Sequence, residues 1–175
     1  MGMSVIISDA GEDDAEQILK LQYLCFQSEA ALYGDWTIEP LTQTLQSLRQ
    51  ELTEQCALVA RLGGEVVGSV RGWVDDAGVA RIGRLAVHPR MQGHGLGGRL
   101  LTGIEQRLAA TGRVRVYRLF TGHRSLGNQR LYRRLGYQET GVVEVDRRLS
   151  MVTLEKSALP EDLPSPAAPT LAASA

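Results

Sequence analysis

The feature that most restricts the fold is a β-rich region between residues 56 and 89. It contains three runs of branched and aliphatic residues, separated by the turn signals Gly63-Gly64 and Asp75-Asp76-Ala77-Gly78. Short turns of this kind join neighbouring strands that run in opposite directions. The region therefore predicts three consecutive antiparallel strands.

On both sides of this region the sequence alternates between helical and strand-like patterns. Apolar residues at helical spacing predict helices over residues 11–30, 41–52, 99–108 and 125–135. Further β-rich runs predict strands over residues 4–10, 114–122 and 147–156. This order of elements indicates a mixed fold of the α/β or α+β class.

Length and composition indicate one domain. The chain has 175 residues, of which 43% are hydrophobic and 22% charged, which is enough to build one buried core. We expect that domain over residues 1–156 and a flexible tail rich in proline and alanine over residues 157–175. The sequence has neither a run of about 20 apolar residues nor a signal-peptide pattern. We therefore expect a cytoplasmic protein with no membrane contact.

Cysteine and histidine patterns argue against a metal site or a disulfide. Cys25 and Cys56 lie in apolar surroundings without a partner motif, which is typical of buried thiols. His88, His94 and His123 do not have the spacing of zinc ligands. We therefore expect no bound metal.

Charge is distributed unevenly along a chain whose net charge is only −1. Residues 1–60 contain ten acidic side chains and two basic ones, whereas residues 78–135 contain twelve arginines and one acid, Glu105. Such an asymmetry indicates charged partners, or solvated faces that happen to segregate. Few aromatic residues lie among the arginines, which argues against nucleic acid as the partner.

Four glycines within six residues, at 93, 95, 97 and 98, precede the predicted third helix. One interpretation is a turn that merely allows the helix to begin. A second is the dinucleotide-binding pattern G-x-G-x-x-G, which Gly93, Gly95 and Gly98 satisfy. The neighbouring segments do not fit this pattern. Five residues separate the preceding strand from the first glycine, and the next strand lacks the acidic residue that binds a ribose.

A third interpretation is a pyrophosphate-binding loop of the form Q/R-x-x-G-x-G/A, formed by Gln92, Gly95 and Gly97. Backbone N–H groups at a helix start have no partner within the helix and, with the helix dipole, bind anionic oxygens. The missing Cβ atoms allow those oxygens to approach closely. The flanking segments RLAVHP and RLL fit this interpretation best.

Two motifs then identify a family resemblance. The segment RIGRLAVHPRMQGHGLGGRLL over residues 81–101, together with NQRLYRRLGY over 128–137, resembles the GNAT superfamily of N-acetyltransferases. The order of elements from Val5 to Lys156 agrees with it. The resemblance implies a central, mostly antiparallel, splayed mixed sheet flanked by about four helices.

The resemblance also implies residues that bind acetyl-CoA. The strand end Leu85, Ala86 and Val87 would pair with the pantetheine arm, as an extended ligand adds to an open sheet edge. The pyrophosphate would lie on the loop, and Arg99 and other arginines between residues 78 and 135 could meet the phosphates. Asn128 would contact the cofactor as well. The loop residues are Gln92, Gly93, His94, Gly95, Leu96, Gly97 and Gly98.

For catalysis the resemblance implies an acid and leaves the base open. Tyr132 corresponds to the tyrosine that protonates the departing thiolate, and we favour this role over the alternative of a buried core aromatic. Relatives often carry a glutamate early in the splayed strand, where this chain has Arg81. Glu29 is the candidate base, with Asp35 as the second choice. Either carboxylate could instead be an ordinary helix-surface residue.

The leading prediction is an N-acetyltransferase that moves an acetyl group from acetyl-CoA to a primary amine by direct attack in a ternary complex. Neither cysteine lies in a nucleophile motif, so no covalent enzyme intermediate is expected. The acceptor is either a small amine or a protein amino group. A non-catalytic acyl-CoA-binding module is the alternative, and an NAD-binding domain ranks third. The sequence leaves a homodimer open.

Overall fold

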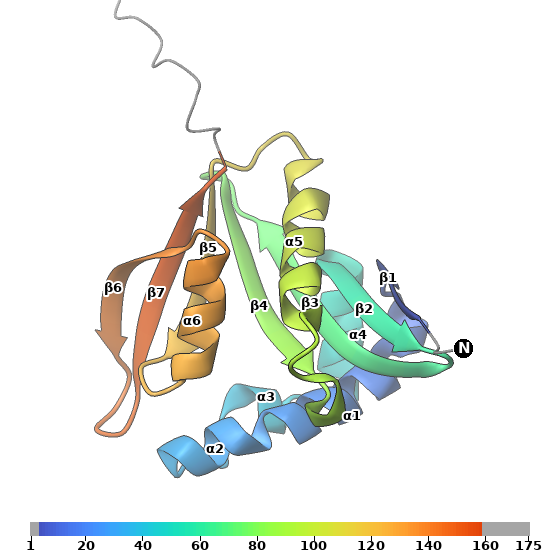
Figure 1. Ribbon diagram of the computed structural model, residues 1–175, viewed down its shortest axis with the longest axis horizontal. Helices are drawn as coiled ribbons and strands as arrows, with labels where there is room; N and C mark the ends of the chain where they lie inside the picture. The colour runs from blue at the N-terminus through green and yellow to red at the C-terminus, as the bar shows by residue number, and fades with distance from the viewer. Residues whose placement is uncertain (1–3, 159–175) are drawn as a thin grey trace, which may run out of the picture.

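A seven-stranded mixed sheet forms the centre of the protein, as a computed structural model shows for residues 4–158 (Figure 1). The strand order is β1-β2-β3-β4-β5-β7-β6. All neighbouring strands run antiparallel except β4 and β5, which are parallel. The strands are β1 (Val5–Asp9), β2 (Cys56–Leu62), β3 (Glu65–Val74), β4 (Val79–Val87), β5 (Val116–Gly122), β6 (Gln138–Glu144) and β7 (Ser150–Ser157).

The three predicted central strands are confirmed as β2, β3 and β4, joined by tight turns. The predicted strands at the two ends of the domain correspond to β1, β5 and β7. Strand β6 was not predicted. It is paired only with β7, and six of its seven residues are exposed, so its sequence shows no alternation of buried and exposed residues.

Six α-helices and two short 3-10 helices surround the sheet. They are η1 (Glu12–Asp14), α1 (Ala15–Cys25), α2 (Gln27–Tyr33), α3 (Glu39–Thr42), α4 (Leu45–Glu54), η2 (Pro89–Met91), α5 (Leu96–Ala109) and α6 (Leu126–Arg134). The first predicted helix is divided at Phe26. The second is divided at Gln43 and Thr44, because Thr44 caps a new helix by accepting a hydrogen bond from the Ser47 N–H at 3.1 Å. The predicted tail began at residue 157, but Ser157 is the last residue of β7; residues 159–175 lie outside the described residues.

Two cores lie on opposite faces of the sheet. On one face, α5 buries Leu96, Leu100, Leu101, Ile104 and Leu108 against the strands, and Tyr132 of α6 joins the same cluster. On the other face, α1 and α4 pack on β2, β3 and β4 through a cluster that includes Ile18, Leu48 and Val59. Burial of apolar area on both sides holds the central strands in a fixed position.

The sheet opens between β4 and β5. The two strands pair through only three residues of each, Val79–Arg81 with Val116–Arg118, and then diverge. A bulge accompanies the divergence, because Ser69 and Arg71 of β3 face Ala86 and Gly83 of β4, so that β4 holds one extra residue. Figure 1 shows the resulting wedge, with α5 beside β4 and α6 beside β5 and β7. The predicted splayed sheet is therefore confirmed.

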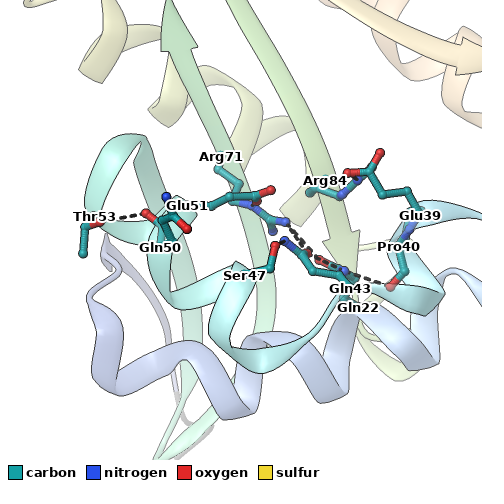
Figure 2. Close-up of polar contacts among 10 residues, drawn as sticks. All are labelled: Gln22, Glu39, Pro40, Gln43, Ser47, Gln50, Glu51, Thr53, Arg71 and Arg84. Atoms are coloured by element: carbon teal, nitrogen blue, oxygen red, sulfur yellow. Dashed lines mark hydrogen bonds and ion pairs between the residues drawn. The ribbon is translucent and has the colours of Figure 1, made fainter.

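A buried polar network fixes the helices of the second face to β3 (Figure 2). Arg71 is 3% exposed, and its guanidinium pairs with the Glu51 carboxylate at 2.9 Å. It also donates hydrogen bonds to the side-chain oxygens of Gln22 at 3.2 Å and Gln43 at 3.0 Å. Gln22 in turn donates to the Pro40 carbonyl at 2.8 Å. One guanidinium therefore connects α1, α3 and α4.

Removing the carboxylate of Glu51 is expected to destabilise the fold. In Glu51→Ala, Arg71 stays buried without its counter-ion, so we expect the free energy of unfolding to fall by about 2–3 kcal/mol. Arg49→Ala on the same helix is the control, because the Arg49–Glu16 pair is exposed and should contribute less than about 1 kcal/mol. Urea unfolding followed by circular dichroism measures both. Equal losses in the two variants would contradict the role assigned to Arg71.

Candidate active site

The glycine loop lies between the diverging end of β4 and the start of α5. Gly93 and Gly95 adopt φ angles of 83° and 75°, which side chains with a Cβ rarely adopt. Gly95 is the N-cap of α5, so the N–H groups of the first helical turn have no partner within the helix. They point out of the helix start, where the dipole favours an anion.

A cleft of about 490 Å³ extends along this loop. We call it the loop cleft. Of the residues predicted to bind the cofactor, nearly all line it. They are Leu85, Ala86, Val87, Gln92, Gly93, Gly95, Leu96, Gly97, Gly98 and Asn128.

Two of the residues predicted to bind the cofactor lie apart from the loop cleft. His94 is exposed and is not among the lining residues. Arg99 points toward β1, where its guanidinium lies 3.5 Å from the Val5 carbonyl oxygen, and it borders a different hollow between α5 and the sheet. The arginine that does line the loop cleft is Arg134, in the last turn of α6.

Val87 presents its backbone groups to the loop cleft. The His88 N–H donates to the Val67 carbonyl of β3, and in an antiparallel pair the residues that face the partner strand alternate. The N–H and C=O of Val87 therefore point away from β3, toward the opening. Its carbonyl accepts hydrogen bonds from the Gln92 amide at 3.2 Å and from the Cys25 thiol at 3.3 Å.

A second cavity of about 570 Å³, the inner pocket, lies deeper in the opening between β4 and β5. Its walls come from α2, α3, β4, α5, β5, α6, the segment between β6 and β7, and the start of β7. The walls are mainly apolar, with Ile82, Leu119 and Met151 among them. Four residues line both the inner pocket and the loop cleft, namely Phe26, Glu29, Leu85 and Asn128. The two cavities therefore meet at this shared wall.

Glu29 is held at the shared wall by hydrogen bonds. Its carboxylate accepts from the Ser125 hydroxyl at 2.7 Å, and the oxygen of Ser125 lies 2.9 Å from the Tyr33 hydroxyl. The Tyr33 oxygen also accepts from the Arg124 N–H at 3.0 Å. The hydroxyl reaches this position because residue 122 is glycine. A Cβ at Gly122 would lie 1.9 Å from the Tyr33 oxygen.

Tyr132 is 7% exposed and lines the inner pocket. Its ring packs against Tyr137, with centroids 6.2 Å apart. Burial and the nearby charge of Glu29 raise the pKa of Tyr132 to about 12. The hydroxyl therefore keeps its proton at neutral pH, although the tyrosine also belongs to the core.

Arg81, Asp35 and Cys25 lie in settings that do not suit proton transfer or nucleophilic attack. Arg81 pairs with Asp75 at 3.1 Å and lies over the Trp73 ring, so it belongs to a surface ion pair. Asp35 lines the inner pocket, but hydrogen bonds from Thr37 lower its pKa. Burial raises the pKa of the Cys25 thiol to about 11, which makes it a poor nucleophile at neutral pH.

Sequence reasoning missed Ser125, Tyr33, Arg84 and Arg134 as site residues. Ser125 and Tyr33 are separated by 92 residues and meet only because α2 crosses the end of β5. Arg134 lies six residues after Asn128 on the same helix, which is not a spacing that places two residues on one face, so helical periodicity does not single it out from the other arginines. No sequence signal distinguishes Arg84 from the other arginines.

The uneven charge is partly neutralised within the fold. Six of the twelve arginines between residues 78 and 135 form ion pairs with acidic residues, as Arg107 does with Asp9 at 2.9 Å. Within residues 4–158, no group of three histidine, cysteine or acidic side chains is placed to hold a metal ion. No helix in the same range is long and apolar enough to cross a membrane.

Solved structures share this architecture at low sequence identity. PaiA N-acetyltransferase of Thermoplasma acidophilum, determined with coenzyme A, is 18% identical, with a TM-score of 0.74 over 89% of this chain and 99% of its own. YncA of Salmonella typhimurium, a putative acetyltransferase with acetyl-CoA, is 21% identical, with a TM-score of 0.72 over 93% and 99%. Ribosomal-protein-alanine N-acetyltransferase of Brucella melitensis is 20% identical, with a TM-score of 0.71 over 87% and 99%.

A family model adds evidence from the sequence itself. The model of the acetyltransferase (GNAT) family matches residues 15–137, from the start of α1 to the residue before β6. The match spans most of the chain and includes β4, the glycine loop and α6. The chain therefore belongs to the GNAT family of acetyltransferases.

Proposed function

We propose that the protein transfers an acetyl group from acetyl-CoA to a primary amine, by direct attack of the amine within a ternary complex. The observation that carries the proposal is the shared wall. One cavity follows the glycine loop, the other lies inside the splayed sheet, and they meet at Glu29 and Asn128. Two substrates bound in these cavities would bring their reacting ends together, which favours a direct transfer.

Acetyl-CoA would occupy the loop cleft. The first-turn N–H groups of α5 would bind its pyrophosphate, and the exposed backbone of Val87 would pair with its pantetheine arm. Family membership and the coenzyme A or acetyl-CoA in two similar structures support this assignment. In the part of the chain that the structure describes, Arg134 is the one arginine that lines this cleft and would meet a phosphate.

The acceptor amine would enter the inner pocket and lose a proton before it attacks, because an ammonium ion has no lone pair. Glu29 would accept this proton directly or through water. The amine nitrogen would then attack the thioester carbonyl carbon, whose oxygen gains negative charge. A donor such as the Val87 N–H would stabilise that oxygen.

Collapse of the tetrahedral intermediate breaks the carbon–sulfur bond and releases the thiolate of CoA. Tyr132 would donate its proton to this sulfur and recover one as the second amine proton is lost. One proton is released to solvent for each ammonium acetylated. The raised pKa keeps Tyr132 protonated until the thiolate forms. The cysteines take no part, consistent with the raised pKa of Cys25.

The alternative of a non-catalytic acyl-CoA-binding module rested on Arg81, which stands where relatives often have a glutamate. Glu29 offers a carboxylate at the junction of the cavities from a different element, so catalysis does not require one at Arg81. Release of CoA thiol from acetyl-CoA, measured against a panel of amines and peptides, distinguishes the two functions. Binding of acetyl-CoA without turnover on any amine would favour the module.

Replacing Tyr132 by phenylalanine is expected to lower kcat by about 100-fold, because the thiolate then leaves without a positioned acid. KM for acetyl-CoA should change little, since the ring that packs in the core is retained. Below about pH 10 the wild-type enzyme should show no loss of rate from ionisation of Tyr132, whose pKa is about 12. Turnover that is unchanged in the variant would remove Tyr132 as the acid.

Replacing Arg134 by glutamine should weaken CoA binding by about tenfold through loss of a phosphate contact. The neighbouring Arg133→Gln is a matched control, because Arg133 pairs with Glu139 and does not line the loop cleft. Calorimetric titration with CoA at two salt concentrations measures both. The loss in the Arg134 variant should shrink at high salt. Similar effects in both variants would indicate general surface charge rather than a phosphate contact.

Ser125→Ala tests whether the hydrogen bond to Glu29 matters for proton transfer. The hydroxyl holds the carboxylate at the shared wall, so its loss should lower kcat by about tenfold. Gly122→Ala, which displaces the Tyr33 hydroxyl, should lower kcat as well. Glu29→Gln removes the proton acceptor and should lower kcat by about 100-fold. Turnover that is unchanged in Glu29→Gln would exclude Glu29 as the base.

A further inference from the structure

Arg84 occupies an unusual backbone position. It lies at the bulge of β4 and has a φ of 55°, the only positive φ at a residue other than glycine within 4–158. Glycine is the unstrained choice at such a bulge, and here a long charged side chain stands there instead. The backbone alone therefore gives no reason for an arginine.

The side chain of Arg84 is incompletely paired. One terminal nitrogen forms an ion pair with the Glu39 carboxylate at 3.2 Å, and Figure 2 shows the two side chains next to each other. The Nε atom is buried and has no hydrogen-bond partner, the only such side-chain atom among the described residues. A ligand in the pocket does not reach the shielded Nε. The rest of the side chain is accessible, since Arg84 is 25% exposed, and its ionic partner Glu39 is 75% exposed, so a ligand carboxylate can take the place of Glu39 at the terminal nitrogens.

Arg84 lines the inner pocket and is the one basic residue among the described residues that do so. Four acidic residues line the same pocket, and three of them accept hydrogen bonds from nearby groups. Asp35 accepts from Thr37, Asp146 accepts from the N–H groups of Arg148 and Leu149, and Glu29 accepts from Ser125. The fourth, Glu39, is the exposed ionic partner of Arg84.

We propose that Arg84 determines acceptor specificity by binding a carboxylate carried on the acceptor amine. A guanidinium binds a carboxylate through N–H donors that lie in one plane, and the terminal nitrogens of Arg84 are the ones that a ligand in the pocket can reach. The amine would lie at Glu29 and the carboxylate at Arg84, with an apolar side chain against Ile82, Leu119 and Met151. The acceptor class is then an apolar α-amino acid. This inference rests on the proposed acetyl transfer to an amine.

The test compares three forms of each probe: L-leucine, L-methionine and L-phenylalanine, their carboxamides, and the amines that lack the carboxyl group. We expect kcat/KM to be at least tenfold higher for the amino acid than for the matching amine. The difference should disappear in Arg84→Gln. It should also disappear in Arg84→Gly, which removes the backbone strain together with the side chain.

Arg81→Gln is the matched control, because Arg81 lies on the same strand in a surface ion pair and does not line the inner pocket. This variant should keep the wild-type preference for the carboxylate. Equal kcat/KM for amino acid and amine in the wild type, or a preference that survives in both Arg84 variants, would overturn the inference while leaving acetyl transfer to amines intact.

A binding measurement tests the inference without turnover. N-acetyl-L-phenylalanine and N-acetylphenethylamine are titrated by calorimetry into the protein saturated with CoA. We expect the carboxylate to bind at least tenfold more tightly, and only when Arg84 is present. Equal binding would overturn the inference. Absence of turnover with every amine would instead overturn the proposed function, which keeps the two failures distinct.

Discussion

The structure depends on one interruption of hydrogen bonding, the separation of β4 from β5. Parallel strands normally satisfy each other's backbone groups along their length, but here only three residues of each strand pair. Beyond Arg81 the edge of β4 that faces β5 has no partner strand, although the other edge still pairs with β3. A strand edge buried in this way needs another partner for its N–H and C=O groups. Both cavities of the site lie in that opening.

An open sheet would collapse or close unless other contacts held it apart. The β2–β4 half is fixed by cores on both faces, with α5 on one side and α1 and α4 on the other. The Arg71 network then ties α1, α3 and α4 to the same half. The half formed by β5, β7 and β6 carries α6, so the two halves form the opposite walls of the opening.

Contacts across the opening position the proposed catalytic residues. Helix α2 reaches from the first half to the second, where Tyr33 and Glu29 meet Ser125 at the start of α6. Gly122 leaves room for this contact at the end of β5. The position of the Glu29 carboxylate therefore depends on the distant residues Gly122 and Ser125 as well as on its own helix. The same arrangement raises the pKa of Tyr132, because burial and the carboxylate of Glu29 act together.

The sequence alone determined the central meander, the glycine loop and the helix after it, because these depend on local turn chemistry and on residue spacing. It also identified the family, since the loop and the NQRLY segment are local motifs. It did not predict β6, because this exposed edge strand has no alternation of buried and exposed residues. It also predicted Arg99 as a cofactor-binding residue, whereas the side chain faces β1 on the other side of α5.

Only the tertiary structure decided which side chains meet at the opening. The contacts of Glu29 with Ser125 and of Arg84 with Glu39 join residues 96 and 45 positions apart, and no local pattern encodes such a distance. The missing partner of the Arg84 Nε is likewise a property of packing, since it arises from what surrounds the bulge. Local sequence fixes which elements form, whereas the burial and neighbours that tune a charged group come from how those elements are packed.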